Sequence, residues 1–163
     1  MRRVFRAMLD GVKTHDDVEI IYPVHLNPVV QEAAQSILGN HPRIHLNDPL
    51  DVVDFHNLAA RSYFIMTDSG GVQEEAPSLG KPVLVLRDTT ERPEGVTAGT
   101  LKLVGTDPDA VRSNMIQLLD DDAEYQRMAN AKNPYGDGHA AERILDAIAY
   151  KYGESSKKPE PFA

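Results

Sequence analysis

The stretch YFIMTDSGGVQEEAPSLGKPVLVLRDTTERPE, residues 63–94, decides the fold. Its two apolar runs of strand length, residues 63–66 and 83–86, are separated by a serine-glycine turn and a short helical segment. A strand, a helix and a second strand in this order form a βαβ unit, whose parallel strands end at the same edge of the sheet. Functional side chains are therefore expected just after each of the two runs.

The turn after the first run contains Ser69, Gly70 and Gly71. A helix beginning there would present unpaired backbone N–H groups, and glycines let an anion approach that backbone closely. The same residues also fit a turn in which Ser69 is only an N-cap and the glycines only permit a tight bend. Glu74 and Glu75 are expected in the helix's first turn, where the dipole favours carboxylates and where a carboxylate could bind ligand hydroxyl groups.

Outward from this unit, strands and helices continue to alternate. Apolar runs predict strands at residues 18–24, 43–46 and 100–104, and helical periodicity predicts helices at residues 2–12, 28–38, 51–61, 93–99, 123–131 and 139–152 and one that begins at residue 108. Asn27 and Asp107, each followed by proline, are expected to cap two of these helices. Ile144, Leu145 and Ile148 are expected to be the buried face of the last helix. The alternation predicts an α/β fold, with a Rossmann-like parallel sheet covered by helices on both faces.

The composition is that of an ordinary α/β domain: 163 residues, 41% hydrophobic, 26% charged and without cysteine. The lack of cysteine excludes disulfides, thiolate metal sites and a cysteine nucleophile, and the histidines show no metal-ligand spacing, so no metal is predicted. A net charge of −8 argues against nonspecific nucleic-acid binding. No run approaches the roughly 20 apolar residues that span a membrane, and no signal peptide is recognisable, so a cytoplasmic location is expected. Residues 1–152 are expected to form one domain and residues 153–163 a disordered tail.

Several motifs together resemble the non-hydrolysing UDP-N-acetylglucosamine 2-epimerases. They are TDSGGVQEEAPSLGKPVLVLRDTTERPEG (67–95), TAGTLKLVGTD (97–107), YPVHLNPVV (22–30), PLDVVDFHNLAARS (49–62) and NPYGDG (133–138). The resemblance implies the second domain of a type-B glycosyltransferase-like architecture, without the first domain and without the second domain's opening strand. That strand is central in a doubly wound sheet, so its loss predicts a gap, an altered strand order or an open edge.

The resemblance also implies a binding site for UDP. Ser69, Gly70 and Gly71 would bind the diphosphate, Glu75 would hold the ribose hydroxyls, and Arg92 would reach the phosphates or the sugar, since its planar fork suits phosphate oxygens. The alternative for Arg92 is an ion pair with an acidic neighbour in its own loop, Glu91 or Glu94, which is typically worth little.

Two further residues are implied by the same resemblance. Phe55 would belong to the uracil pocket, where an aromatic ring can stack on the base, although a core phenylalanine is the simpler interpretation. His25 would belong to a second, regulatory site for a UDP-sugar, and a histidine that only stabilises a turn is the alternative.

The implied reaction interconverts UDP-N-acetylglucosamine and UDP-N-acetylmannosamine by elimination and re-addition of UDP, without a cofactor. General acid-base carboxylates are needed at the sugar, and the resemblance puts them in the first domain. No catalytic residue is therefore assigned here beyond assistance from Arg92, and the chain alone is expected to be inactive. Self-association into a homo-oligomer is expected. The alternatives are a non-catalytic UDP-sugar-binding module and the nucleotide-binding half of a glycosyltransferase.

Overall fold

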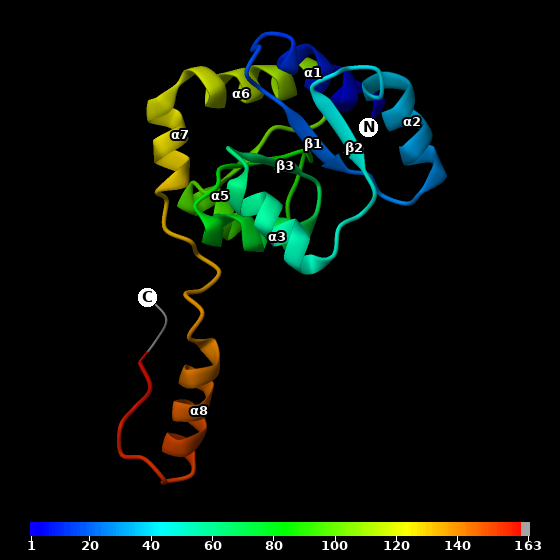
Figure 1. The fold of residues 1–163 in the computed structure, drawn as a ribbon. Coiled ribbons are helices and arrows are strands. Elements are labelled where there is room, and N and C mark those ends of the chain that lie inside the picture. Colours follow the sequence, from blue (N-terminus) through cyan, green and yellow to red (C-terminus); the bar gives the residue numbers. More distant parts are fainter. Residues whose placement is uncertain (161–163) are drawn as a thin grey trace.

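The computed structural model describes residues 1–160 (Figure 1). The elements follow one another as α1 (Arg2–Val12), β1 (Ile20–Pro23), α2 (Pro28–Leu38), β2 (Ile44–Asn47), α3 (Val52–Arg61), β3 (Ile65–Thr67), α4 (Gly70–Glu75), the 3-10 helix η1 (Ala76–Leu79), β4 (Val83–Val85), α5 (Pro93–Ala98), β5 (Leu101–Leu103), α6 (Pro108–Asp120), α7 (Asp122–Ala129) and α8 (Ala140–Lys151). Each predicted strand and helix is present, with ends that differ by a few residues. The predicted α/β class is confirmed.

The five strands of the described chain are parallel, but they form two sheets rather than the single sheet that alternation alone predicts. β1 pairs with β2, with Ile20 opposite Ile44. In the second sheet the order is β3-β4-β5, with Val83 of β4 between Ile65 and Leu101. Strand β1 thus has one partner, β2, and strand β3 has one partner, β4, among residues 1–160. Of the outcomes predicted for a sheet without its opening strand, the structure has the gap.

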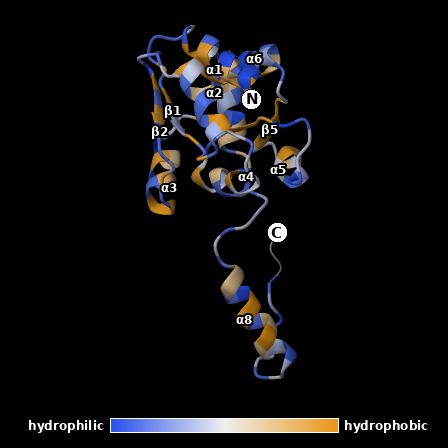
Figure 2. Cartoon of the chain, turned by 90° about the vertical axis from the view of Figure 1, so that its right-hand side faces the viewer, coloured by the Kyte–Doolittle hydropathy of each residue, from blue (hydrophilic) through white to orange (hydrophobic). Residues whose placement is uncertain are grey.

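One apolar core nevertheless joins the two sheets. Ile20 and Tyr22 of β1, Met66 of β3 and Leu84 of β4 all pack into the same cluster. Helices α1, α2 and α6 cover one face of the strands, and α3, α4 and α5 lie on the other (Figures 1 and 2). Side-chain packing therefore holds the two sheets together, because no backbone ladder joins β1 to β3.

The predicted helix caps are present. The Asn27 side chain accepts a hydrogen bond from the Val29 N–H at 2.9 Å. The Asp107 side chain accepts from the N–H groups of both Asp109 and Ala110 at 3.1 Å. In each case a carbonyl or carboxylate oxygen satisfies a backbone donor that the first helical turn leaves unpaired, which is why these short polar residues begin helices here.

Helix α8 differs from the expectation. It extends away from the layers (Figure 1), its ribbon carries hydrophobic colouring along much of its length (Figure 2), and none of its residues is buried. Ile144, Leu145 and Ile148 are 59%, 66% and 49% exposed, so their predicted burial is wrong. Periodicity identified the stripe correctly but could not show that no element within residues 1–160 covers it.

The segment expected to be a disordered tail, residues 153–163, follows α8 in the sequence. Residues 153–160 contain turns and bends without helix or strand, whereas residues 161–163 of that predicted tail lie outside the described part of the chain. No helix within residues 1–160 has the length and apolar character required to cross a bilayer.

Candidate functional site

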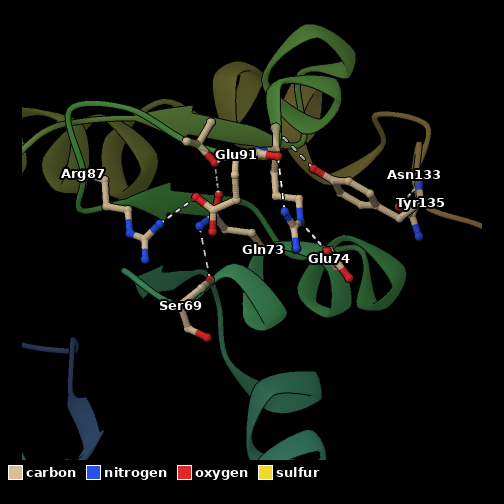
Figure 3. Close-up of polar contacts among 9 residues, drawn as sticks. Ser69, Gln73, Glu74, Arg87, Glu91, Asn133 and Tyr135 are labelled. Carbon is tan, nitrogen blue, oxygen red and sulfur yellow. Dashed lines mark hydrogen bonds and ion pairs between the residues drawn. The ribbon is translucent and has the colours of Figure 1, made fainter.

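The polar residues predicted to gather after β3 and β4 do meet at one edge of the second sheet. Strand β3 ends at Thr67, and Ser69 is the residue before α4. The loop after β4 folds back over the start of α4, where Glu91 and Arg92 approach Gly70 (Figure 3). This juxtaposition follows from the parallel register of β3 and β4, which puts both carboxyl ends on the same side.

The Ser69 side chain makes no capping hydrogen bond, although Ser69 occupies the N-cap position. Its backbone N–H instead donates to the Thr67 hydroxyl at 3.0 Å. Ser69 is exposed, as is Gly71 beside it. The hydroxyl of Ser69 therefore does not stabilise the first turn of α4. The interpretation of Ser69 as only an N-cap is not supported.

The two glycines differ in what surrounds them. A Cβ atom on Gly70 would lie 2.7 Å from Glu91 Oε1 and 3.8 Å from Arg92 Nη2, so Gly70 permits the close approach of the loop. A Cβ atom on Gly71 would meet nothing nearer than 3.9 Å among the described residues. The backbone at Gly71 is thus open to an approaching group, whereas that at Gly70 faces a carboxylate and a guanidinium.

Arg92 lies beside this turn but pairs with a residue that sequence reasoning did not choose. Its Nε donates to Glu74 Oε1, and its Nη1 donates to the backbone carbonyl of Glu91 at 3.2 Å. Glu91 itself is bound at 2.7 Å by Arg87 Nη1. A hydrogen bond from its own backbone N–H, followed by the charges of Arg87 and Arg92, lowers the pKa of Glu91. The Arg92 guanidinium and the Glu91 carboxylate, which Arg87 binds, therefore lie above Gly70.

Gln73, which sequence reasoning passed over, links the turn to the loop (Figure 3). Its side chain is fully buried. Its Nε2 donates to the Ser69 carbonyl at 3.2 Å, and its Oε1 accepts from the Thr90 hydroxyl at 2.6 Å. A glutamine four residues after the turn carries no sequence signal for burial, because most glutamines are exposed.

Tyr135, from the NPYGDG motif, is a second residue that holds the loop. Its hydroxyl donates to the Arg92 carbonyl at 3.4 Å, and burial of the ring raises its pKa. The backbone N–H of Tyr135 donates to Asn133 Oδ1 at 3.0 Å, which fixes the turn that brings the tyrosine to the loop (Figure 3). A residue 43 positions further along the chain than Arg92 thus returns to the candidate site.

Glu74 and Glu75 lie at the end of α4 rather than in its first turn, so that expectation is wrong. The helix is only six residues long, and its first turn consists of Gly70, Gly71 and Val72. Glu75 Oε2 lies 3.1 Å from His56 Nε2 on α3. Both groups are about half exposed, so this pair lies open to solvent beside the turn.

Phe55 lies on α3 next to His56, with the two ring centroids 6.0 Å apart. It is half-buried and belongs to neither apolar cluster of the described chain, so it is not a core phenylalanine. Helix α3 thus presents the Phe55 ring next to His56, the residue that contacts Glu75.

His25 lies elsewhere, in the turn after β1. It is exposed, and its Nδ1 accepts a hydrogen bond from the Asn27 N–H at 3.0 Å. This contact is what a turn-stabilising histidine would make, and no hydrogen bond from the other ring nitrogen to the described residues accompanies it.

As for a metal site, no group of three or more potential ligands occurs within residues 1–160.

Comparison with known proteins identifies the family. A family model described as UDP-N-acetylglucosamine 2-epimerase matches residues 1–149. The chain is 58% identical over 162 residues to the UDP-N-acetylglucosamine 2-epimerase of Bacillus subtilis, and the match covers 99% of this chain but only 43% of that protein. The chain thus spans less than half the length of this curated relative.

Solved structures give the same result. The Staphylococcus aureus protein MnaA in complex with UDP superposes with a TM-score of 0.93 at 54% identity, over 99% of this chain and 44% of that one. The UDP-GlcNAc 2-epimerase of Neisseria meningitidis bound to UDP-GlcNAc superposes with a TM-score of 0.85 at 44% identity, over 90% of this chain and 40% of that one. The chain therefore belongs to the UDP-N-acetylglucosamine 2-epimerase family.

Proposed function

We propose that this chain is the UDP-binding half of an epimerase that interconverts UDP-N-acetylglucosamine and UDP-N-acetylmannosamine. One observation carries the proposal: the Ser69 turn and the Arg92 loop converge over Gly70 at the carboxyl edge of a parallel sheet. Ligands of such sheets bind at this edge. The proposal is supported by the family and by relatives solved with UDP and with UDP-GlcNAc.

In this proposal the diphosphate is bound by backbone and guanidinium donors. The N–H groups of Gly70 and Gly71 donate to phosphate oxygens, with the unused Ser69 hydroxyl beside them. Arg92 turns from Glu74 toward the phosphates, where charge-assisted hydrogen bonds are stronger than neutral ones. Glu91 shares the space above Gly70, so its carboxylate must move away when an anion enters.

The nucleoside lies along α3. Phe55 stacks on the uracil ring, and Glu75 accepts hydrogen bonds from the ribose hydroxyls in place of its contact with His56. His25, in its separate turn after β1, binds a second UDP-sugar that regulates the enzyme. Its exposed ring and its place after a strand support this role, although its contact with Asn27 also fits a turn residue.

The reaction proceeds by elimination and re-addition. A base removes the proton from C2 of the sugar while the C1–oxygen bond to UDP breaks, which leaves a 2-acetamidoglucal. UDP then adds back to C1, and a proton is delivered to the other face of C2. The residues of this chain stabilise the negative charge on the departing UDP. The acid-base carboxylates come from polypeptide outside these 163 residues, so the chain alone turns nothing over.

Two further parts of the proposal concern the protein's surroundings. Self-association is supported by the strand edges of β1 and β3 that carry no ladder within residues 1–160. Sedimentation of the purified chain as a monomer at all concentrations would contradict it. A cytoplasmic location is supported by a cysteine-free sequence.

Calorimetric titration of the chain with UDP tests the proposed function. Saturable binding of UDP is expected, together with much weaker binding of uridine and of inorganic pyrophosphate, because each of these fills only part of the site. No epimerisation of UDP-N-acetylglucosamine is expected from the chain alone. A folded chain that takes up no UDP at millimolar concentration would contradict the proposal.

A further inference from the structure

We infer that Gln73 is a positioning residue that sets the spacing between the Ser69 turn and the Arg92 loop. The inference rests on the proposed function, because the two segments are the two sides of the proposed diphosphate site. Gln73 itself touches no ligand. It lies behind the site, on the side of α4 that faces the interior (Figure 3).

The burial of Gln73 is unusual for its residue type. Its side chain has 0% exposure, while most glutamines of folded proteins are exposed. A buried amide is tolerated only when its polar atoms are hydrogen-bonded. Both ends of the Gln73 amide are bonded, one to Ser69 and the other to Thr90. The amide is therefore a specific connection and not a core-filling group.

The hydrogen bonds form a chain with a fixed direction. The backbone N–H of Arg92 donates to Thr90 Oγ1 at 3.0 Å, and the Thr90 hydroxyl then donates to Gln73 Oε1 at 2.6 Å. Gln73 Nε2 donates in turn to the Ser69 carbonyl at 3.2 Å. A backbone N–H can only donate and a backbone carbonyl can only accept, so both ends determine how the hydroxyl and the amide must point.

This chain of hydrogen bonds matters because the loop is otherwise exposed. Asp88, Thr89 and Glu91 are exposed, and Thr90 is the residue of the loop whose side chain bonds the buried amide of Gln73. Its bond to Gln73 acts together with the contacts of Arg92 with Glu74 and Tyr135, and Arg92 lies 3.8 Å from where a Cβ atom on Gly70 would be. If the bond is lost, Glu74 and Tyr135 still hold Arg92, but the loop is no longer connected to the Ser69 carbonyl, and we expect a spacing that fits one diphosphate less well.

Thr90→Val is the principal test, since valine has nearly the shape of threonine and replaces the hydroxyl with a methyl group that can neither donate to Gln73 nor accept from the Arg92 N–H. Thr90→Ser is the matched control, because it keeps the hydroxyl. UDP affinity is expected to fall roughly tenfold in Thr90→Val and to stay within about twofold in Thr90→Ser. Gln73→Met should weaken UDP binding similarly, and the double variant should lose little more, because both changes break the same connection.

A second ligand separates positioning from general damage. Uridine, which lacks phosphates, should bind Thr90→Val as it binds the unmodified chain in an NMR titration. Equal losses of uridine and UDP affinity would show a merely structural role and overturn the inference. An unchanged UDP affinity in Thr90→Val would overturn it while leaving the proposed function intact. Failure of the unmodified chain to bind UDP would instead contradict the proposed function itself, and with it this role of Gln73.

Discussion

Arg92 is bound to Glu74 across the gap between the loop and α4, and not to the side chains of the acidic residues next to it in sequence. Its Nε donates to Glu74 Oε1, and both side chains are only partly exposed. The guanidinium therefore lies beside the turn at Gly70 and is already paired with a carboxylate. In the proposed complex, Arg92 would exchange this carboxylate for a phosphate of UDP.

Arg92→Ala should weaken UDP binding about tenfold, because it removes a charge-assisted contact to phosphate. Uridine binding should not change. Arg92→Lys keeps the charge but loses the planar fork. Its UDP affinity should therefore lie between those of the unmodified chain and Arg92→Ala. The unfolding free energy should fall by no more than about 1 kcal/mol, since partly exposed ion pairs contribute little. Calorimetry and thermal denaturation of the three proteins measure these effects; equal UDP affinity in all three would exclude Arg92 from the site.

Gly71→Ala should abolish UDP binding without lowering stability. A Cβ atom at this position meets nothing nearer than 3.9 Å in the described chain, and alanine is the better helix former. The methyl group would nevertheless stand where a phosphate must approach the backbone. Circular dichroism would report the melting temperature and calorimetry the UDP affinity. A variant that binds UDP normally would show that the diphosphate does not lie against Gly71.

Ser69→Ala should leave stability almost unchanged, because the Ser69 side chain makes no capping hydrogen bond. Asp107→Ala is the matched comparison: its side chain bonds two backbone N–H groups, and its loss should cost about 1 kcal/mol. Urea denaturation of both variants tests the difference. In UDP titrations the more affected variant should be the other one: the UDP affinity should fall several-fold in Ser69→Ala and stay unchanged in Asp107→Ala. A large loss of stability in Ser69→Ala would restore the N-cap interpretation.

Glu124 should make the stability of the chain depend on acid pH. Arg127 binds its carboxylate at 2.7 and 2.9 Å, and this hydrogen-bonded pairing, with Lys102 nearby, lowers the pKa of Glu124. A carboxyl whose pKa is lower in the folded state stabilises the fold above its unfolded pKa, and this contribution disappears as the pH falls through the folded pKa. Glu124→Gln should therefore be less stable by about 1 kcal/mol at pH 7.

The same pair of proteins should converge in stability as the pH falls through the lowered folded-state pKa of Glu124, where the unmodified chain also loses the charge. Urea denaturation at pH 7, 5 and 3 measures the difference directly. A constant difference between the two proteins over this range would mean that Glu124 contributes through packing and not through its charge.

Leu145→Ala should be almost neutral in this chain, within about 0.5 kcal/mol, because Leu145 is 66% exposed on α8. Leu84→Ala, at a fully buried position of β4, should cost roughly 3 kcal/mol. Thermal or urea denaturation compares them. A loss for Leu145→Ala close to that of Leu84→Ala would mean that α8 is covered in solution, for instance by another copy of the chain.

The sequence predicts local structure well here because local signals are strong. Asn27 and Asp107 each precede a proline, and both cap helices as expected. The order of strands and helices also predicts which edge of the sheet carries the site. Ser69, Gly70 and Arg92 are consequently found together, because parallel strands with short connections leave few alternatives.

What the sequence could not predict depends on contacts between distant segments. The apolar stripe of α8 is real, but periodicity does not say what covers it, and Ile144 remains exposed. Helix α4 begins at Gly70, so Glu74 and Glu75 are its fifth and sixth residues and lie beyond its first turn, directly before the 3-10 helix at Ala76. Gln73 is the clearest omission, since its burial depends on Thr90, 17 positions away.

The central claim is that the turn of Ser69, Gly70 and Gly71 binds the diphosphate of UDP. Titration of the 15N-labelled chain with UDP, followed by amide NMR spectra, tests it most directly. The account predicts that the amide signals of these three residues shift in a saturable way, together with that of Arg92. A folded chain in which UDP leaves these amides unshifted, or shifts only residues elsewhere, would contradict it.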